Sequence, residues 1–154
     1  TNPFYRLDNV GVYTFSPYKV HWKEQTGSMS AVVVSSYLQS IPNADDTLFS
    51  KDKVIVVDSK VLMLSLYNEM EAYYVCGIIN APHITEVVDG YAISTNRGVD
   101  VLKYIAIPKY DASNALHTTI AMTSKEIHSL AKEDKDYTKQ EILLNQSVEK
   151  LFLG

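Results

Sequence analysis

The sequence contains a single cysteine, only six glycines and no glycine-rich loop that could hold the phosphates of a nucleotide. The single thiol, Cys76, excludes an internal disulfide and a cluster of thiolate metal ligands. Cys76 lies in an apolar run, residues 74–79, which predicts a buried and unreactive side chain. The sequence also lacks a signal peptide and an apolar stretch long enough to cross a bilayer. We therefore expect a cytoplasmic protein that does not span a membrane.

The composition is that of one globular domain. The chain has 154 residues, of which 46% are hydrophobic and 21% charged, which suits a single core and argues against disorder. The net charge of −4 argues mildly against a free-standing nucleic-acid-binding protein. Charge acts locally, however, and residues 91–110 contain three cations against one Asp. Because the sequence begins with Thr1, we expect a fragment of a longer protein.

The first part of the chain, residues 1–67, predicts mainly β-structure. Side chains alternate between apolar and polar over 18–23, as they do in a strand with one buried face. Residues 31–34, 53–58 and 61–66 form further short β-branched or apolar runs.

Residues 68–110 and 111–154 predict mostly helices. Asn68 caps a helix that we expect to run to Asn80 and to end before Pro82, followed by a shorter helix over 84–91 and a strand over 102–107. Two capped helices, one starting after Asn114 and one at Thr138, predict an antiparallel hairpin over 114–152. The expected fold is α+β: a mixed β-sheet packed with helices, followed by a C-terminal helical hairpin.

Side chains expected in the core include several aromatic ones. Trp22, Tyr73, Tyr74 and Phe152 are assigned to packing rather than to stacking on nucleic-acid bases. Gly77 is expected to allow the first helix to approach the sheet closely.

Catalytic motifs are missing from this sequence. The four histidines lack the close spacing of metal ligands, and no nucleophile elbow is present. The acidic pair Asp45-Asp46 falls in a predicted loop, which favours solvated side chains over an acid–base pair. We expect this chain by itself to catalyse no reaction and to bind neither a metal nor a cofactor.

Three ordered stretches carry a resemblance to a known family: residues 4–23, with FYRLDNVG and YTFSPYKVHWK; residues 71–80, EAYYVCGIIN; and residues 102–111, LKYIAIPKYD. Together they resemble the C-terminal target-recognition domain of TaqI-like and type IIG-like adenine-specific DNA methyltransferases of restriction–modification systems. Weaker similarity continues over residues 116–152. Glu24 departs from the family, which often has a second basic residue there.

The resemblance implies a division of labour within a larger protein. The resemblance implies that a catalytic domain outside this chain would bind S-adenosylmethionine and a flipped adenine, and some members of the family carry a restriction endonuclease in the same polypeptide. Residues 1–154 would form a single domain that recognises double-stranded DNA and contacts the parent's methyltransferase domain.

DNA recognition requires cations for phosphates and forked or amide side chains for base edges. The strand 18–23 presents Lys19, His21 and Lys23 on the face opposite Trp22. The alternative is an ordinary solvated face on an edge strand, where charges prevent aggregation.

The polar loop 94–98 offers a second set of DNA-binding candidates. Asn96 suits adenine and Arg97 suits guanine in the major groove, with Ser94 beside them. Lys103 is expected to contact phosphate or solvent. The alternative for this loop is an ordinary polar turn, and the alternative for the whole domain is a protein-interaction or subunit-docking module that uses the helical hairpin.

Overall fold

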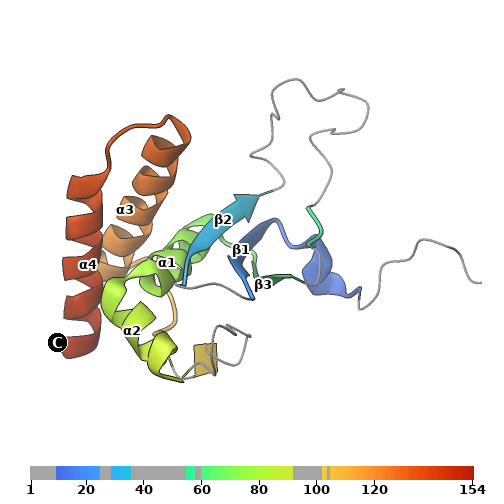
Figure 1. The fold of residues 1–154 in the computed structure, drawn as a ribbon, viewed down its shortest axis with the longest axis horizontal. Helices are drawn as coiled ribbons and strands as arrows, with labels where there is room; N and C mark the ends of the chain where they lie inside the picture. The colour runs from blue at the N-terminus through green and yellow to red at the C-terminus, as the bar shows by residue number, and fades with distance from the viewer. Residues whose placement is uncertain (1–9, 25–28, 36–54, 58–59, 92–101, 104) are drawn as a thin grey trace, which may run out of the picture.

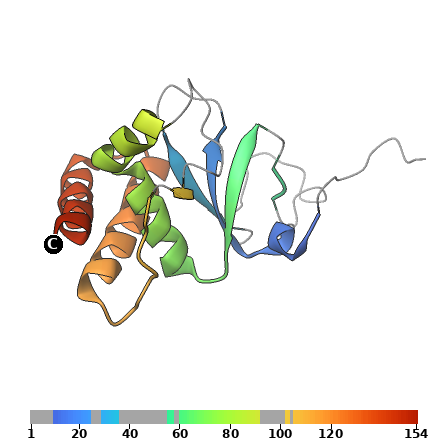
Figure 2. The same ribbon diagram turned by 90° about the horizontal axis from the view of Figure 1, so that it is seen from below.

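The computed structural model describes residues 10–24, 29–35, 55–57, 60–91, 102–103 and 105–154. The described part is an α+β fold with a C-terminal pair of helices, which confirms the expected fold class (Figure 1). The elements follow in the order η1 (Val12–Phe15), β1 (Tyr18–Lys23), β2 (Ala31–Ser35), β3 (Val61–Leu66), α1 (Glu69–Asn80), α2 (Pro82–Tyr91), α3 (Ala115–Lys132) and α4 (Thr138–Leu153). Helix α1 lies between the sheet and the α3–α4 hairpin (Figure 2).

The described strands form a sheet in the order β2-β1-β3. Both strand pairs are antiparallel, whereas a mixed sheet was expected. The register places Val20 of β1 opposite Val33 on one side and Leu64 on the other. Val20 and Trp22 are buried in the core shared with α1, together with Val33 of β2, which confirms the position predicted for the apolar face of β1.

Two predicted strands are wrong where the structure describes them. Residues 55–57 have no regular structure, and the rest of the predicted strand lies outside the described residues. In place of the strand at 102–107, Leu102 and Lys103 form a short turn and the described residues after them are irregular. The N–H of Ile105 donates to the carbonyl of Leu102 and that of Ile107 to the carbonyl of Ile105. Local turns thus satisfy backbone groups that a strand would offer to a neighbour.

The helix starts follow the predicted caps with two changes. Asn68 accepts a hydrogen bond from the backbone N–H of Glu71 at 3.0 Å, as a capping side chain does. Pro82 does not only follow α1; it is also the first residue of α2, where its missing N–H costs nothing.

The hairpin is present as expected, although α4 starts differently. Asn114 caps α3 by accepting from the N–H groups of Leu116 and His117. Thr138 was expected to cap α4, but the cap position is Tyr137. The Thr138 hydroxyl instead donates to the carboxylate of Asp136 at 2.6 Å, so Asp136 holds the start of the helix.

The core confirms the aromatic assignments. Trp22, Tyr73 and Tyr74 are buried, and Phe152 is half-buried against them. Gly77 allows a close approach, but to the hairpin rather than to the sheet. A Cβ at this position would lie 3.1 Å from the side chains of both Leu144 on α4 and Ser124 on α3.

Candidate functional site

The polar face of β1 is buried, contrary to expectation. Lys19 and His21 are only 3% and 7% exposed, so this part of the strand offers neither a solvated face nor a surface for DNA. The ammonium of Lys19 donates to the backbone carbonyl of Ile55 at 2.8 Å, which shows that segment 55–57 lies against this face. The sequence pattern could not reveal this covering segment.

Burial also lowers the pKa of both of these side chains. Burial and the nearby Lys19 ammonium lower the pKa of His21 to about 4. His21 is therefore neutral at physiological pH, and its Nε2 atom is buried without a hydrogen-bond partner. A neutral, buried imidazole cannot act as a counterion for phosphate.

Lys23, at the end of β1, is exposed as expected and lies near a second lysine. It pairs with Val61 in the sheet, and the next N–H along the chain, that of Glu24, donates to the carbonyl of Lys60 at 3.1 Å. Lys60 is also exposed, so two lysines occupy the same end of the sheet. Lys60 was not among the predicted DNA contacts, because its proximity to Lys23 depends on the register of β1 with β3.

An open cleft of about 430 Å³ lies at this end of the sheet; we call it the sheet-end cleft. Its wall includes the exposed side chain of Lys23 and that of Val32, which is 46% exposed. The full lining consists of His21, Trp22, Lys23, Ser30, Ala31, Val32 and Val61. Neither Asp nor Glu is among these residues, although Glu24 is the next residue after Lys23.

The remaining predicted DNA contacts cannot be joined to this cleft. Ser94, Asn96 and Arg97 lie outside the described residues. Lys103 is exposed in its short turn and is not one of the residues that line the sheet-end cleft.

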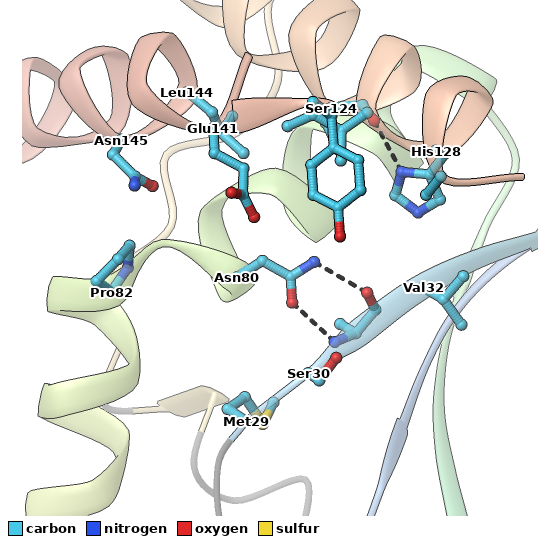
Figure 3. A pocket seen from close by; sticks show the side chains of 14 residues that line it. Met29, Ser30, Val32, Asn80, Pro82, Ser124, His128, Glu141, Leu144 and Asn145 are labelled. Carbon is cyan, nitrogen blue, oxygen red and sulfur yellow. Dashed lines mark hydrogen bonds between the residues drawn. The ribbon is translucent and has the colours of Figure 1, made fainter. Parts of the chain in front are cut away.

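A second hollow of about 510 Å³ lies between the outer edge of β2, the end of α1 and the α3–α4 hairpin (Figure 3); we call it the hairpin cavity. Asn80 at the end of α1 accepts from the N–H of Ala31 at 2.7 Å and donates to its carbonyl at 2.9 Å. Its amide thereby replaces a neighbouring strand along the open edge of β2.

His128 of α3 occupies the next position along the same edge. Its Nδ1 lies 2.7 Å from the carbonyl of Ser124, and its Nε2 accepts from the N–H of Val33 at 3.1 Å. This pair of contacts requires the neutral tautomer with the proton on Nδ1. Burial lowers the pKa of His128, which favours the same neutral form.

Metal ligands and nucleophiles do not cluster in the described part of the chain. No group of three or more His, Cys, Asp or Glu side chains there is placed to hold a metal ion. Cys76 is fully buried, as expected, and burial raises the pKa of its thiol to about 12. None of the helices built from the described residues combines the length and apolar character that spanning a bilayer requires.

Comparison of the chain with protein-family models, with curated proteins and with solved structures finds no significant match.

Proposed function

We propose that this chain is the sequence-recognition module for double-stranded DNA of an adenine-specific DNA methyltransferase of the restriction–modification kind. The ordered resemblance over residues 4–23, 71–80 and 102–111 supports this proposal. The parent would act in the cytoplasm, with S-adenosylmethionine and the flipped adenine bound in a catalytic domain next to this chain.

The sheet-end cleft is the observation that carries the proposal. Lys23 lines the cleft, the exposed Lys60 directly precedes its lining residue Val61, and no carboxylate is among the described residues that line it. Each strand of a DNA duplex carries one phosphate charge per about 3.4 Å of helix axis, and a pair of neighbouring ammonium groups suits such a backbone. The acidic run at residues 133–136 lies on the hairpin connection and is not among the residues that line the cleft.

The division of labour between contacts differs from the sequence-based prediction. Lys23 and Lys60 would bind phosphates and so orient the module, while the buried side chains of Lys19 and His21 would pack beneath the surface of the domain. Base recognition would remain with Ser94, Asn96 and Arg97, and Lys103 would add a phosphate contact.

The test is duplex binding by the intact chain over a series of salt concentrations, measured by fluorescence anisotropy with random-sequence duplexes. Each phosphate contact contributes about 0.9 to the slope of log K against log salt. The double variant Lys23→Gln with Lys60→Gln should lower that slope by roughly 2. Glu24→Gln should increase affinity, because it removes a negative charge beside Lys23.

The matched control is Lys139→Gln with Lys150→Gln, two exposed lysines on α4 that are absent from the cleft lining. This variant changes the net charge equally and should leave the slope within about half a unit of the wild-type value. Equal slopes for both double variants would place the DNA contact elsewhere.

A docking module is the second candidate, and an apolar face on the hairpin favours it. Met122 of α3 and Leu143 of α4 are both exposed. The hydrogen bond between Gln140 and Glu126 fixes the register of the two helices, and one turn away Met122 and Leu143 fall on the same side. If Met122→Gln with Leu143→Gln removes association with the parent's methyltransferase domain and leaves DNA binding unchanged, the hairpin is the docking surface.

A further inference from the structure

The hairpin cavity has the size and the mixed lining of a small-molecule site. Its volume of about 510 Å³ falls within the range of ligand pockets, roughly 300–1,000 Å³. Met29, Pro82, Ile127 and Leu144 supply apolar surface on several sides. A ligand there would therefore need an apolar body.

The cavity lining contains donors as well as acceptors, among them the hydroxyl groups of Ser30, Ser124 and Tyr137 and the amide of Asn145. Asn80 uses its amide nitrogen on the Ala31 carbonyl and on the sulfur of Cys76, which leaves only its oxygen with spare capacity. Both ring nitrogens of His128 are occupied. Figure 3 shows the Glu141 carboxylate reaching from α4 toward Asn80.

Glu141 gives the cavity a negative charge without a counterion. No hydrogen bond or ion pair of its side chain occurs in the described part of the chain, and the same is true of the Asn145 amide one turn further along α4. Neither Lys nor Arg is among the described residues that line the cavity, and His128 is held neutral by the Val33 N–H. An alkylammonium group, which has three donors and no acceptor, complements the Glu141 carboxylate and the Asn80 oxygen.

We propose that the hairpin cavity binds a small primary amine with an apolar body, the ammonium group meeting Glu141 and the Asn80 oxygen. The apolar body lies against Met29, Ile127 and Leu144. This site shares Ser30, Ala31 and Val32 with the sheet-end cleft, but its ligand contacts lie on the other side of β2 and do not require DNA binding.

The test compares 2-phenylethylamine with 2-phenylethanol, which has nearly the same shape but no charge, by calorimetry on the intact chain. A hydrogen bond to a charged group is worth roughly a tenfold to hundredfold difference in affinity, so the amine should bind at least about tenfold more tightly. Glu141→Gln should remove this preference and leave binding of the alcohol unchanged. In the wild-type chain, the amine should also shift the amide resonances of Ala31 and Val33.

Two further variants test whether the preference for the amine arises in the hairpin cavity. Glu149→Gln removes an exposed carboxylate of α4 that does not line the cavity, and it should leave both affinities unchanged. Ala131→Trp fills the cavity from α3 and should abolish binding of both compounds. Equal affinity for amine and alcohol, an amine preference that survives Glu141→Gln, or binding that survives Ala131→Trp would each overturn the proposal. So would a failure of the folded wild-type chain to bind the amine at millimolar concentration.

Discussion

The substitution Asn80→Asp tests whether a single amide holds the open edge of the sheet. Asn80 makes two hydrogen bonds to Ala31, one in each direction, at 2.7 and 2.9 Å. Asp has the same shape, but at neutral pH it replaces the donating nitrogen with an oxygen that faces the Ala31 carbonyl. The variant loses one hydrogen bond and leaves a buried carbonyl next to a like partial charge, at a cost of about 2–4 kcal/mol of unfolding free energy.

The cost should depend on pH in a defined direction. Burial and the facing carbonyl disfavour the charged form, so the new carboxyl should have a folded-state pKa above its unfolded value of about 3.9. The folded variant then binds more protons than the unfolded one between those two values, and its stability falls as pH rises through that range. Below about pH 4 the protonated carboxyl donates to the Ala31 carbonyl, and most of the deficit relative to the wild-type chain should disappear.

Urea denaturation of both proteins from acid to neutral pH measures this deficit. The matched control is Asn145→Asp, which makes the same chemical change in the same cavity at a side chain without a hydrogen-bond partner in the described part of the chain. It should cost about 0.5 kcal/mol or less, the size of a like-charge contact with Glu141 one turn away. Equal losses in the two variants, or a deficit for Asn80→Asp that does not change with pH, would refute the role of Asn80.

Three further predictions follow from burial and packing. Because the pKa of His21 is lowered to about 4, the unfolded chain binds a proton between about pH 6.5 and 4 and the folded chain does not. Relative to the His21→Gln variant, the wild-type chain should therefore lose roughly 3 kcal/mol of unfolding free energy as the pH falls through that window, as measured by urea titration. The Cys76 thiol, whose pKa burial raises to about 12, should react with a disulfide reagent at pH 8 only after addition of denaturant, and rapid labelling of the folded chain would show that the helix opens locally. Gly77→Val should destabilise the protein by about 1–3 kcal/mol because its side chain meets α3 and α4, whereas Gly90→Val, where nothing lies within 4 Å of an added Cβ, should change stability by less than about 0.5 kcal/mol.

The sequence predicted the elements whose signals are local. Asn68 and Asn114 start their helices as capping residues do, and the alternation over 18–23 placed Val20 and Trp22 in the core. Each of these inferences needs only a few neighbouring residues. These predictions were confirmed. The strand expected at 102–107 was not, because a strand also needs a neighbouring strand to bond its backbone groups, and Ile105 and Ile107 bond locally instead.

Contacts between distant residues could not be predicted from one sequence. An alternating strand has a polar face by sequence, but whether that face meets water depends on other segments; here Lys19 meets Ile55, 36 residues away. His128 reaches the N–H of Val33 across 95 residues, and no pattern near either residue indicates that contact. The place of Lys60 in the candidate site likewise depends on a contact between distant residues, because the register of β1 with β3 brings it next to Lys23.

The start of β2 connects the two hollows of this domain. Ser30, Ala31 and Val32 line both the sheet-end cleft and the hairpin cavity, and Asn80 holds Ala31 through both of its backbone groups. Asn80 and His128 hold neighbouring backbone groups of this strand edge, at Ala31 and at Val33, and a shift at Ala31 would change the walls of the cleft and of the cavity together. If the cleft meets DNA as proposed, Asn80→Asp should weaken duplex binding at neutral pH without altering the salt slope, because it displaces the wall of the cleft and leaves Lys23 and Lys60 in place.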